Sequence, residues 1–575
     1  MRRDPLQLQE REFDLAVVGG GIFGICTAWD AALRGLSVAL IERGDFVQAT
    51  SAHSFRMVHG GIRYLQHGDL LRIRESVRER RALLRMAPHL VEPLPIVIPT
   101  YGHGREGKEA LGFGLRLYDL WAADRNRGIH DPARQIPSGR IISRTDCLRL
   151  FPELEATDLT GAGLFYDGQM YNPPRLALSI LRSAVAAGAV AVNYAAARRF
   201  IRRHNRIIGV SVVDTVTGNE LDVRAKVVVN TTGGWAPTLL QSASGLRLSP
   251  GVTFSRDTCF VLKRRARSPH GLAILGQTRD PDAWVSRAAR HLFLVPWRGY
   301  TLLGVWHKPW HDDPDRVTVM EAELLSFLGE INASCPALGI TPDDVSCCDA
   351  GLVLFGENAE RATNLRYGHR SRIVDHRLVD GVDGLITSIG VRWTTARAVA
   401  EEVVTLAGYK LGRSLAPSRT AHTPVHGGAI PDIQKFVEST VGGRPASLRE
   451  DAARSLARNH GSAVGELLAH IYDDPALAAS VDGSHVVAAE VVHAAREEMA
   501  QHLTDVVYRR TDLGTAERPT RTALEICGRL MAAELGWSSE RTLAEISNAE
   551  RSFPVASAAQ PAARPPVERP LQALL

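Results

Sequence analysis

A glycine-rich turn between two apolar runs constrains the fold of this chain more than any other feature. Residues 13–18 have the composition of a short buried strand, a helix is expected over 25–33, and residues 36–41 make a second strand that ends at Glu42. The turn after the first strand has the spacing G-x-G-x-x-G, formed by Gly19, Gly21 and Gly24. This order of elements predicts a dinucleotide-binding βαβ unit.

Each glycine of the turn has a separate task. Gly19 permits the tight turn, Gly21 lets a pyrophosphate approach the backbone, and Gly24 lets helix and strand pack closely. The helix N-terminus offers N–H groups and a positive dipole end to the phosphates. Glu42, 18 residues after Gly24, can accept hydrogen bonds from a ribose diol and would repel the 2′-phosphate of NADP. The motif therefore favours FAD or NAD.

Two later segments return to the same sheet. Residues 225–235 read as a buried strand that breaks into a small-residue turn, after antiparallel strands over 206–213 and 220–223. Residues 384–390 form a further strand, followed by a helix over 394–406. A sheet assembled from three separated segments is typical of FAD folds, whereas a simple NAD domain is contiguous. A multidomain α/β protein with unrelated glycine turns is the alternative.

Composition excludes several classes of protein. The chain has 575 residues, 45% of them apolar and 23% charged, with a formal net charge of +5, which is too small a surplus to argue for nucleic acid. The seven cysteines have no metal-ligand spacing, so we expect reduced thiols and no metal. No apolar run reaches the roughly 18 residues of a spanning helix, and the N-terminal run reads as strand, turn and helix rather than a signal peptide. A cytoplasmic protein is therefore expected.

Several motifs resemble those of the FAD-dependent glycerol-3-phosphate dehydrogenases. The most specific is H-G-G-I-R-Y over residues 59–64, and the likeness covers about residues 13–545. Further similar stretches are residues 49–54, 80–90, 229–235, 424–430, 458–462 and 509–511. The resemblance implies FAD-dependent oxidation of sn-glycerol 3-phosphate to dihydroxyacetone phosphate, by hydride transfer to flavin N5, with the electrons passed to a quinone.

The family likeness also implies a fold of the α/β class. A glutathione-reductase-like, FAD-binding Rossmann domain would be interleaved with an antiparallel β domain that caps the substrate, and a helical C-terminal domain would follow. The expected boundaries are a catalytic body over 13–422, with FAD-binding parts at about 13–100, 170–240 and 375–410 and cap parts at about 100–170 and 245–375, a helical domain over 423–553, and a disordered tail over 554–575.

By the same resemblance, Arg63 and Tyr64 line the substrate side of the flavin, and Arg392 stands where the family has lysine. His59 is a candidate base or ring-positioning residue, although a structural histidine beside a glycine turn is an equal alternative. Arg256 is a further candidate cation. The expected cofactor contacts are Gly19, Gly21, Gly24, Glu42, Thr50, Ser51, His53, Gly60, Gly233, Gly390, Thr394 and Thr395.

The sequence departs from the family at the substrate wall. Val353 stands where the family's S-G-V-R-P-L has the arginine that binds the substrate phosphate; the K-G-S-H stretch becomes R-D-T-C over 256–259, and G-T-T-D becomes G-V-W-H over 304–307. Losing a charge-assisted phosphate contact should be serious. Candidates to restore the cation are Arg256, Arg361 and Arg366. The alternative function is therefore a dehydrogenase or oxidase of the same fold acting on another hydroxy or amino compound.

Some expectations concern the cofactor link and the partners. His53 occupies a position where related amine-oxidising flavoproteins resemble this segment and attach FAD covalently, so we hypothesise such a link, which acid precipitation would reveal as flavin colour in the pellet. The substrate is expected to be a small molecule, a polyol phosphate by resemblance. A quinone acceptor, peripheral contact with the inner face of the cell membrane and a homodimer also belong to this interpretation. The arginines over 72–85 suit either lipid headgroups or a solvated helix face.

Overall fold

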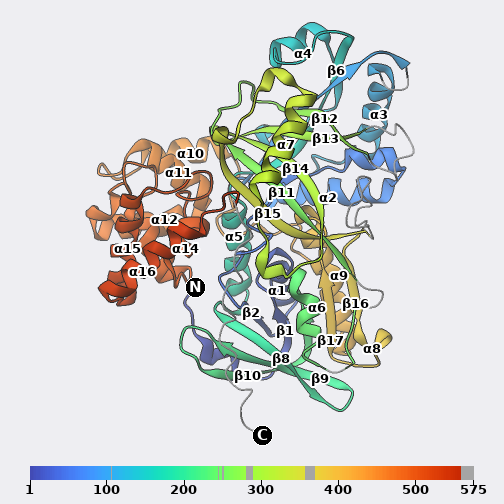
Figure 1. Cartoon of the computed structure of the whole chain (residues 1–575). Coiled ribbons are helices and arrows are strands. Elements are labelled where there is room, and N and C mark those ends of the chain that lie inside the picture. Colours follow the sequence, from blue (N-terminus) through green and yellow to red (C-terminus); the bar gives the residue numbers. More distant parts are fainter. Residues whose placement is uncertain (105–106, 244, 249–251, 280–288, 357–369, 558–575) are drawn as a thin grey trace.

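Two β-sheets and a group of C-terminal helices make up the chain (Figure 1). In Figure 1 the first sheet lies in the lower half, the second in the upper half, and the C-terminal helices at the left. This computed structural model describes residues 1–104, 107–243, 245–248, 252–279, 289–356 and 370–557.

The first sheet is assembled from three separated parts of the chain, in the order β16-β17-β10-β1-β2-β7. The pairs from β17 to β7 are parallel, β16 is antiparallel to β17, and β8 and β9 continue from β10 as an antiparallel ribbon. The strands are β1 (Phe13–Val18), β2 (Val38–Ile41), β7 (Val190–Val192), β8 (Ala195–Arg203), β9 (Arg206–Asp214), β10 (Glu220–Asn230), β16 (Arg372–Asp375) and β17 (Leu385–Ile389). The two segments predicted to return to the sheet of β1 therefore do so.

Both faces of β1 are buried, as expected for a continuous apolar run. Leu15 and Val17 belong to the core formed with three helices, whereas Ala16 and Val18 pack toward the β8–β10 ribbon. The helices are α1 (Ile22–Leu33), α5 (Pro173–Ala186) and α9 (Ala396–Lys410). Helix α1 begins at Ile22 and not at the predicted Ile25, because extended backbone at Gly21 already forms its N-cap.

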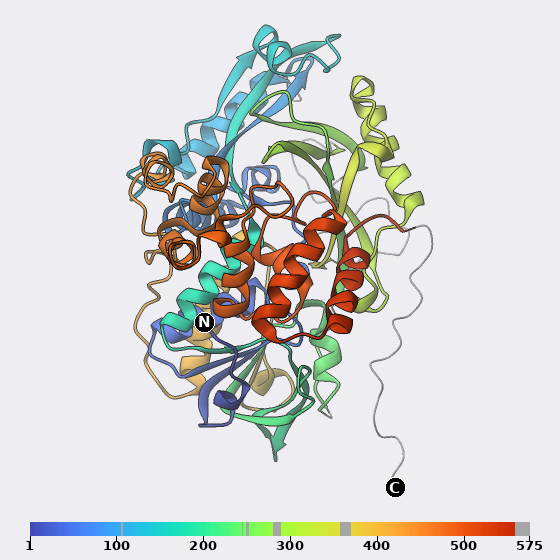
Figure 2. The ribbon, with the colours of Figure 1, turned by 90° about the vertical axis from the view of Figure 1, so that its left-hand side faces the viewer.

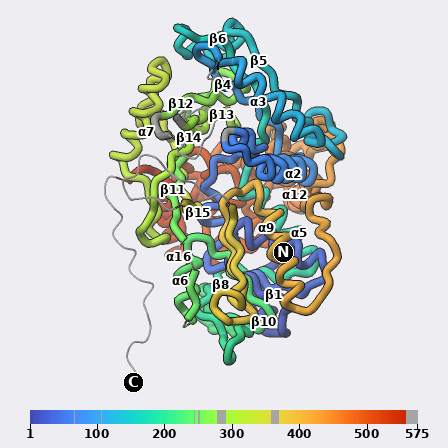
Figure 3. The backbone as a smooth tube through the Cα atoms, turned by 90° about the vertical axis from the view of Figure 1, so that its right-hand side faces the viewer, coloured from blue at the N-terminus to red at the C-terminus, as the bar shows by residue number. Residues whose placement is uncertain are grey.

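The second sheet has the order β15-β11-β14-β13-β12-β4-β6-β3, with β5 beside β6, and only its β12–β4 pair is parallel. Its strands are β3 (Met57–Val58), β4 (Val91–Tyr101), β5 (Arg140–Ser143), β6 (Leu159–Met170), β11 (Thr253–Leu262), β12 (Gly271–Arg279), β13 (Ala289–Trp297), β14 (Tyr300–Trp310) and β15 (Val345–Phe355). The helices beside it are α2 (Leu70–Met86), α3 (Lys108–Trp121), α4 (Arg144–Leu150) and α7 (Glu321–Ser334), whereas α6 (Ala236–Leu240) and α8 (His376–Val379) contact strands of the first sheet. Figure 3 shows α2 between α9 and α3.

One expected boundary is wrong. Residues 91–100 were assigned to the FAD-binding part, but β4 pairs along its length with β6 in the second sheet, and β3 joins the same sheet. The error has a physical reason. The sheet to which β4 belongs is decided by its pairing with β6, and β6 lies far from β4 in the sequence. The chain crosses to the cap before α2.

The C-terminal helices pack around two apolar cores of their own. They are α10 (Ile433–Gly442), α11 (Glu450–His460), α12 (Val464–Asp473), α13 (Ala488–Glu497), α14 (Leu503–Asp505), α15 (Arg521–Leu535) and α16 (Ser539–Ser552). Figure 2 shows them in front of α5, drawn in teal. Arg175 of α5 forms a buried ion pair with Glu498 at 2.6 Å, and Asp45 pairs with Arg509 and Arg510 at 2.5 and 2.6 Å.

The start of the predicted disordered tail is ordered. The N–H of Cys348 donates to the carbonyl of Pro554 at 2.9 Å, and the N–H of Ser557 donates to that of Val319 at 2.8 Å. One backbone group on the edge strand β15 and one just before α7 thus hold a segment whose composition alone suggested disorder. The rest of the predicted tail, 558–575, lies outside the described residues.

All seven cysteines are buried and unpaired by disulfides. Burial raises the pKa of Cys26, Cys348 and Cys527 to about 12, so these thiols stay protonated. Within the described ranges, no helix combines the length and the apolar character that crossing a bilayer requires.

The Asp45 cluster should hold the C-terminal helices to the catalytic body. Asp45→Asn leaves the buried Arg510 without its counter-charge and leaves Arg509 with Asp505 alone, so we expect the free energy of unfolding in urea to fall by about 3–5 kcal/mol. Asp451→Asn, which breaks an exposed pair with Arg449, should cost less than about 1 kcal/mol. Equal losses would contradict the assignment.

Burial opposes ionisation of Asp45, but Arg510 and Arg509 lower its pKa to about 2. The contribution of the Asp45 ion pairs to the free energy of unfolding is therefore complete above about pH 4 and is lost as the pH falls toward 2.

Candidate active site

A cavity of about 2190 Å³ opens between the two sheets and reaches the C-terminal helices. It exceeds the roughly 300–1,000 Å³ of most ligand pockets. Its walls come from the carboxyl ends of β1, β10 and β17, from strands β11, β13, β14 and β15 of the second sheet, and from residues after α13. The cavity therefore has room for a dinucleotide and a substrate together.

The glycine turn lies at the first-sheet end of the cavity. Gly19 and Gly21 line it, whereas Gly24 is packed behind them: a Cβ on Gly24 would lie 1.8 Å from the carbonyl oxygen of Gly19. Gly19 has φ of +110°, which favours glycine. At Gly21 a Cβ would lie 3.2 Å from the Oγ of Ser51, a close contact that a small shift of this side chain would relieve. The glycine therefore leaves the backbone open to a group in the cavity, as the motif predicts.

Glu42 lies at the end of β2 and lines the cavity. Its carboxylate accepts hydrogen bonds from the N–H groups of Gly20 at 2.6 Å and Gly44 at 2.9 Å. Burial raises its pKa despite these bonds. The carboxylate is therefore held in place with capacity to accept further hydrogen bonds from a diol.

The other two segments of the first sheet reach the same end. Gly233 follows β10 with φ of +56° and lines the cavity, as does Gly390 after β17. A Cβ on Gly390 would meet the ring of Phe23 at 1.8 Å. The predicted Thr394 also lines the cavity, and its hydroxyl accepts from the N–H of His59 at 3.2 Å. Thr395 does not: its hydroxyl donates to the carbonyl of Arg392 and stabilises the start of α9.

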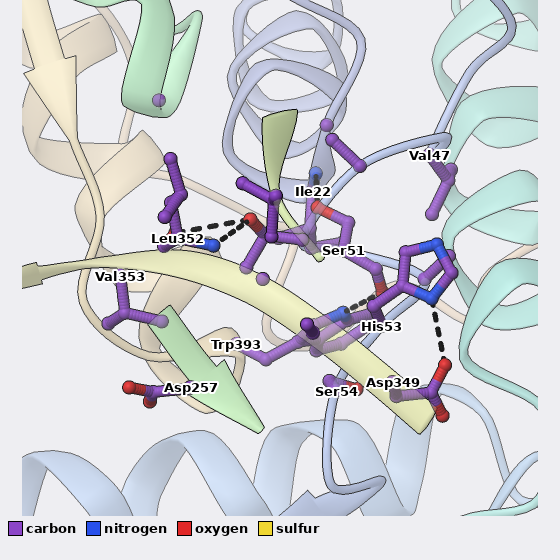
Figure 4. Close-up of a pocket in the computed structure, with 18 of the residues that line it drawn as sticks. Ile22, Val47, Ser51, His53, Ser54, Asp257, Asp349, Leu352, Val353 and Trp393 are labelled. Carbon is purple, nitrogen blue, oxygen red and sulfur yellow. Dashed lines mark hydrogen bonds and ion pairs between the residues drawn. The ribbon is translucent and has the colours of Figure 1, made fainter. Parts of the chain in front are cut away.

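Thr50, Ser51 and His53 all line the cavity and tie the two sheets together. Figure 4 shows Ser51 and His53. The hydroxyl of Thr50 exchanges hydrogen bonds with the backbone of Leu352 at 3.1 and 2.9 Å, and Ser51 accepts the N–H of Ile22 at 3.0 Å. The Nδ1 atom of His53 lies 2.8 Å from Asp349. The hypothesised covalent link of His53 stays a prediction, with Nε2 as the atom that Asp349 leaves available.

His59 is held by a buried carboxylate. Its Nδ1 lies 3.1 Å from Asp167, which also accepts the N–H of Gly60 at 2.6 Å and pairs with Arg80 at 3.0 Å. The bond to His59 and the charge of Arg80 outweigh burial and lower the pKa of Asp167. Gly60 is not at the cavity surface; a Cβ there would clash with Arg80 and Tyr118. The structure thus gives Gly60 a role in close packing, and its expected cofactor contact stays a prediction.

Three of the predicted catalytic residues form one wall. Arg63, Tyr64 and Arg392 line the cavity, and the Arg392 guanidinium lies 5.1 Å from the ring centre of Tyr64. Arg392 is also paired with Glu75 at 3.2 Å and bonded to the hydroxyl of Ser76 at 2.9 Å. These contacts fix the planar fork that replaces the family's lysine.

Arg256 is not at the site. It is buried on the other face of β11 from Asp257, where it pairs with Glu323 at 3.0 Å and donates to the carbonyl of Thr318 at 2.6 Å. The error follows from strand alternation, since the next residue, Asp257, faces the cavity. The other two residues that were considered as replacement cations, Arg361 and Arg366, lie outside the described residues.

The cap strands carry cavity residues that the motifs did not identify. Val353 of β15 lines the cavity, and Figure 4 shows it with Asp257 of the paired strand β11. The Nδ1 atom of His307 on β14 lies 2.7 Å from Asp257. Arg290 and His291 of β13 complete this wall; burial and the charge of Arg63 lower the pKa of His291 to about 4. Alternation along each strand is the sequence signal that indicates such positions, once the sheet order is known.

Comparison with known proteins agrees with this geometry. The model of the family described as FAD dependent oxidoreductase matches residues 14–411, and that of the C-terminal domain of alpha-glycerophosphate oxidase matches 418–542. Glycerol-3-phosphate dehydrogenase of Synechocystis sp. is 32% identical, covering 94% of this chain and 96% of that protein. Glycerol-3-phosphate dehydrogenase 2 of Mycobacterium tuberculosis is 30% identical, covering 96% and 91%.

Two solved structures have a similar fold. The glycerol-3-phosphate dehydrogenase of Bacillus halodurans, complexed with FAD, has a TM-score of 0.73 at 23% identity and covers 95% of both chains. L-Proline dehydrogenase of P. horikoshii has a TM-score of 0.51 at 16% identity, covering 70% of this chain and 95% of its own. The predicted α/β fold and the FAD cofactor are confirmed, and the glycine cradle, the carboxylate and the large cavity fit FAD.

The glycine turn yields a test of FAD binding. Gly21→Val should remove FAD, because the side chain enters the space that the pyrophosphate needs while the backbone, at φ of −75°, accepts valine. The measurement is the ratio of flavin to protein absorbance after purification. Gly114→Val on α3, where a Cβ meets nothing within 4 Å, is the matched control and should keep FAD. A fully loaded Gly21→Val protein would contradict this placement of the pyrophosphate.

Proposed function

The chain belongs to the FAD-dependent oxidoreductase family, within it to the glycerol-3-phosphate dehydrogenases, and we propose that it oxidises sn-glycerol 3-phosphate to dihydroxyacetone phosphate. Bound FAD supplies a hydride acceptor. The observation that carries the proposal is the joint presence, in the FAD cavity, of guanidinium groups and of histidines paired with carboxylates. Such a site binds an anion and accepts a hydroxyl proton.

The cationic wall suits a phosphate. Arg63 lines the cavity together with Arg290, and both lower the pKa of His307, which places their charges near the same imidazole. Arg392 and Tyr64 extend this wall on the α2 side. Guanidinium groups bind phosphate through charge-assisted and often bidentate hydrogen bonds. These residues therefore offer the anion contact that Val353 does not.

Val353 supports the alternative substrate. An apolar side chain on β15 at the cavity surface is what a site for an uncharged hydroxy or amino compound would have. The two functions share FAD and the hydride transfer, and differ in whether the pocket needs a phosphate. A reaction with glycerol 3-phosphate therefore distinguishes the two functions.

Anaerobic mixing with glycerol 3-phosphate tests the proposal. We expect the oxidised flavin band at about 450 nm to bleach, and Arg63→Ala to bleach at least about 100-fold more slowly while keeping FAD, because it loses charge-assisted bonds to the phosphate. Arg267→Ala, an exposed arginine outside the cavity, is the control. No bleaching of the unchanged protein, with reduction by dithionite intact, would favour the alternative substrate; a fast Arg63→Ala protein would remove Arg63 from the site.

We propose a quinone as the electron acceptor, on the basis of the likeness to the family. Reoxidation of the reduced protein by a short-chain ubiquinone, measured against oxygen, decides between a dehydrogenase and an oxidase. A homodimer and a cytoplasmic location stay predictions of the same likeness.

Helix α3 offers a surface for peripheral contact with a membrane. Phe113 and Leu120 are 71% and 73% exposed and lie seven residues apart on one helix face, beside half-exposed Trp121. Arg116 lies on the same exposed side. Exposed aromatic and aliphatic side chains next to cations suit an anionic lipid surface, where quinones are dissolved. Among the arginines of α2, for which lipid headgroups and a solvated helix face were the two alternatives, Arg74 and Arg81 are paired with Asp124.

Vesicle flotation tests this surface. The holoprotein should float with vesicles that contain phosphatidylglycerol, and the triple change Phe113→Ser, Leu120→Ser and Trp121→Ser should reduce the bound fraction at least about tenfold, because it removes the buried apolar area. The matched control is Leu378→Ser with Tyr409→Ser, two side chains that are 83% and 77% exposed elsewhere. Equal binding by both variants would refute α3 as the contact.

A further inference from the structure

Three histidines of the cavity wall are each bonded through Nδ1 to an aspartate, and each pair joins residues from different segments. The pairs are His53 with Asp349 at 2.8 Å, His59 with Asp167 at 3.1 Å, and His307 with Asp257 at 2.7 Å. An imidazole whose Nδ1–H is held by a carboxylate can accept a proton at Nε2, as a general base does.

The third pair differs from the other two in its electrostatics. Asp349 and Asp167 also form ion pairs with Arg56 at 2.8 Å and Arg80 at 3.0 Å, so arginines already neutralise them. Asp257 instead accepts the hydroxyl of Ser255 at 2.8 Å, and in the described part of the chain no arginine or lysine pairs with it. Its charge is therefore directed at His307 and stabilises the imidazolium that forms when His307 takes a proton.

The surroundings of His307 keep it ready to accept that proton. Strand β14 is flanked by β11, which carries Asp257, and by β13, which carries Arg290, and the charge of Arg63, another residue of the cavity wall, also acts on His307. The ring lies 6.2 Å from that of Phe355, nearly parallel to it. Burial, Arg290 and Arg63 lower the pKa of His307, and Asp257 only partly opposes them. The imidazole is thus neutral at pH 7, with Nδ1 as donor to Asp257.

We propose that Nε2 of His307 accepts the proton of the substrate's secondary hydroxyl, with Asp257 as the positioning residue. This rests on the proposed oxidation of glycerol 3-phosphate. As the C–H hydride leaves for the oxidised flavin, the O–H bond breaks, its proton goes to Nε2 and the carbon–oxygen double bond forms. Arg63 and Arg290, in the same wall, stabilise the negative charge that develops on the oxygen.

The departures from the family motifs acquire a common explanation. Cys259 replaces the histidine of the family's K-G-S-H motif on β11. On the neighbouring strand β14, His307 replaces the aspartate of the family's G-T-T-D motif. Asp257 replaces the glycine of the K-G-S-H motif on β11. Because β11 and β14 are paired, an imidazole and a carboxylate are still present in this wall, with their strands exchanged. His59 is the rival base, and His291, with a pKa of about 4, is too weak a base for this task.

The protonation of His307 can be measured without any substrate. In holoprotein labelled with ¹³C at the histidine Cε1, the signal that disappears in His307→Asn reports its titration. We expect a pKa below 6.5, and a further decrease in Asp257→Asn, because the carboxylate that favours the imidazolium is gone. A His307 that is protonated at pH 7.5, or a pKa that is unchanged in Asp257→Asn, would overturn the proposal whatever the substrate is.

Anaerobic flavin reduction supplies the second measurement. His307→Asn should keep FAD and substrate binding but reduce the flavin about 10²–10³-fold more slowly, and should lose the acid limb of the rate–pH profile. His311→Asn, an exposed histidine beyond the end of the same strand, is the control. Reduction of His307→Asn within about threefold of the unchanged protein, or a large loss in His59→Asn alone, would overturn the proposal. Failure of the unchanged protein to bleach would instead reject the substrate, and the titration would still decide the role of His307.

Discussion

The contact between the glycine turn and the end of β10 is the constraint on which the cofactor site depends. The hydroxyl of Thr231 donates to the carbonyls of Val18 and Gly19 at 2.9 and 3.0 Å, and a Cβ on Gly19 would lie 2.8 Å from the carbonyl of Thr231. Backbone therefore touches backbone where β1 and β10 end. Because β17 pairs with β10 in parallel, its terminal Gly390 reaches the same edge. Three segments, distant in sequence, deliver their N–H groups and glycines to one point, which is where a sheet of this class binds its ligand.

A second set of contacts fixes the cap over this point. Thr50 holds the backbone of Leu352, while His53 and Arg56 share Asp349, so the segment after β2 is bonded to β15 at two successive places. Asp349 is buried and its pKa is lowered, since Arg56 and His53 outweigh burial. The same segment thus lines the cavity where the cofactor is expected and fixes the position of β15 in the opposite wall. A change in its backbone would move both, and the hydrogen bonds and ion pairs between the segment and β15 oppose such a change.

The sequence predicts local features well and side-chain direction poorly. The glycine turn, Glu42 and each of the three segments of the first sheet follow from patterns within about thirty residues, and the structure has them. Arg256 and β4 were misplaced because the decisive information is a strand partner far along the chain: β11 pairs with β14 and β15, and β4 with β6. The His307–Asp257 pair illustrates the same point. The motifs show both residues, but only the register that brings β11 beside β14 shows that they meet.

The cationic wall extends this argument to Val353. Phosphate binding requires a positively charged side chain in the cavity, and that side chain can come from any of the strands that line it. Ser255 pairs with Val353 across β11 and β15, and its neighbour Asp257 brings a negative charge to that side. An arginine at 353 would lie beside this carboxylate and would compete with His307 for it. A cavity that uses Asp257 to hold an imidazole therefore favours an apolar neighbour there. Arg290 lies on β13, across β14 from the strands that carry Asp257 and Val353. The loss at Val353 and the gain at Asp257 are, on this reading, two parts of one rearrangement of charge.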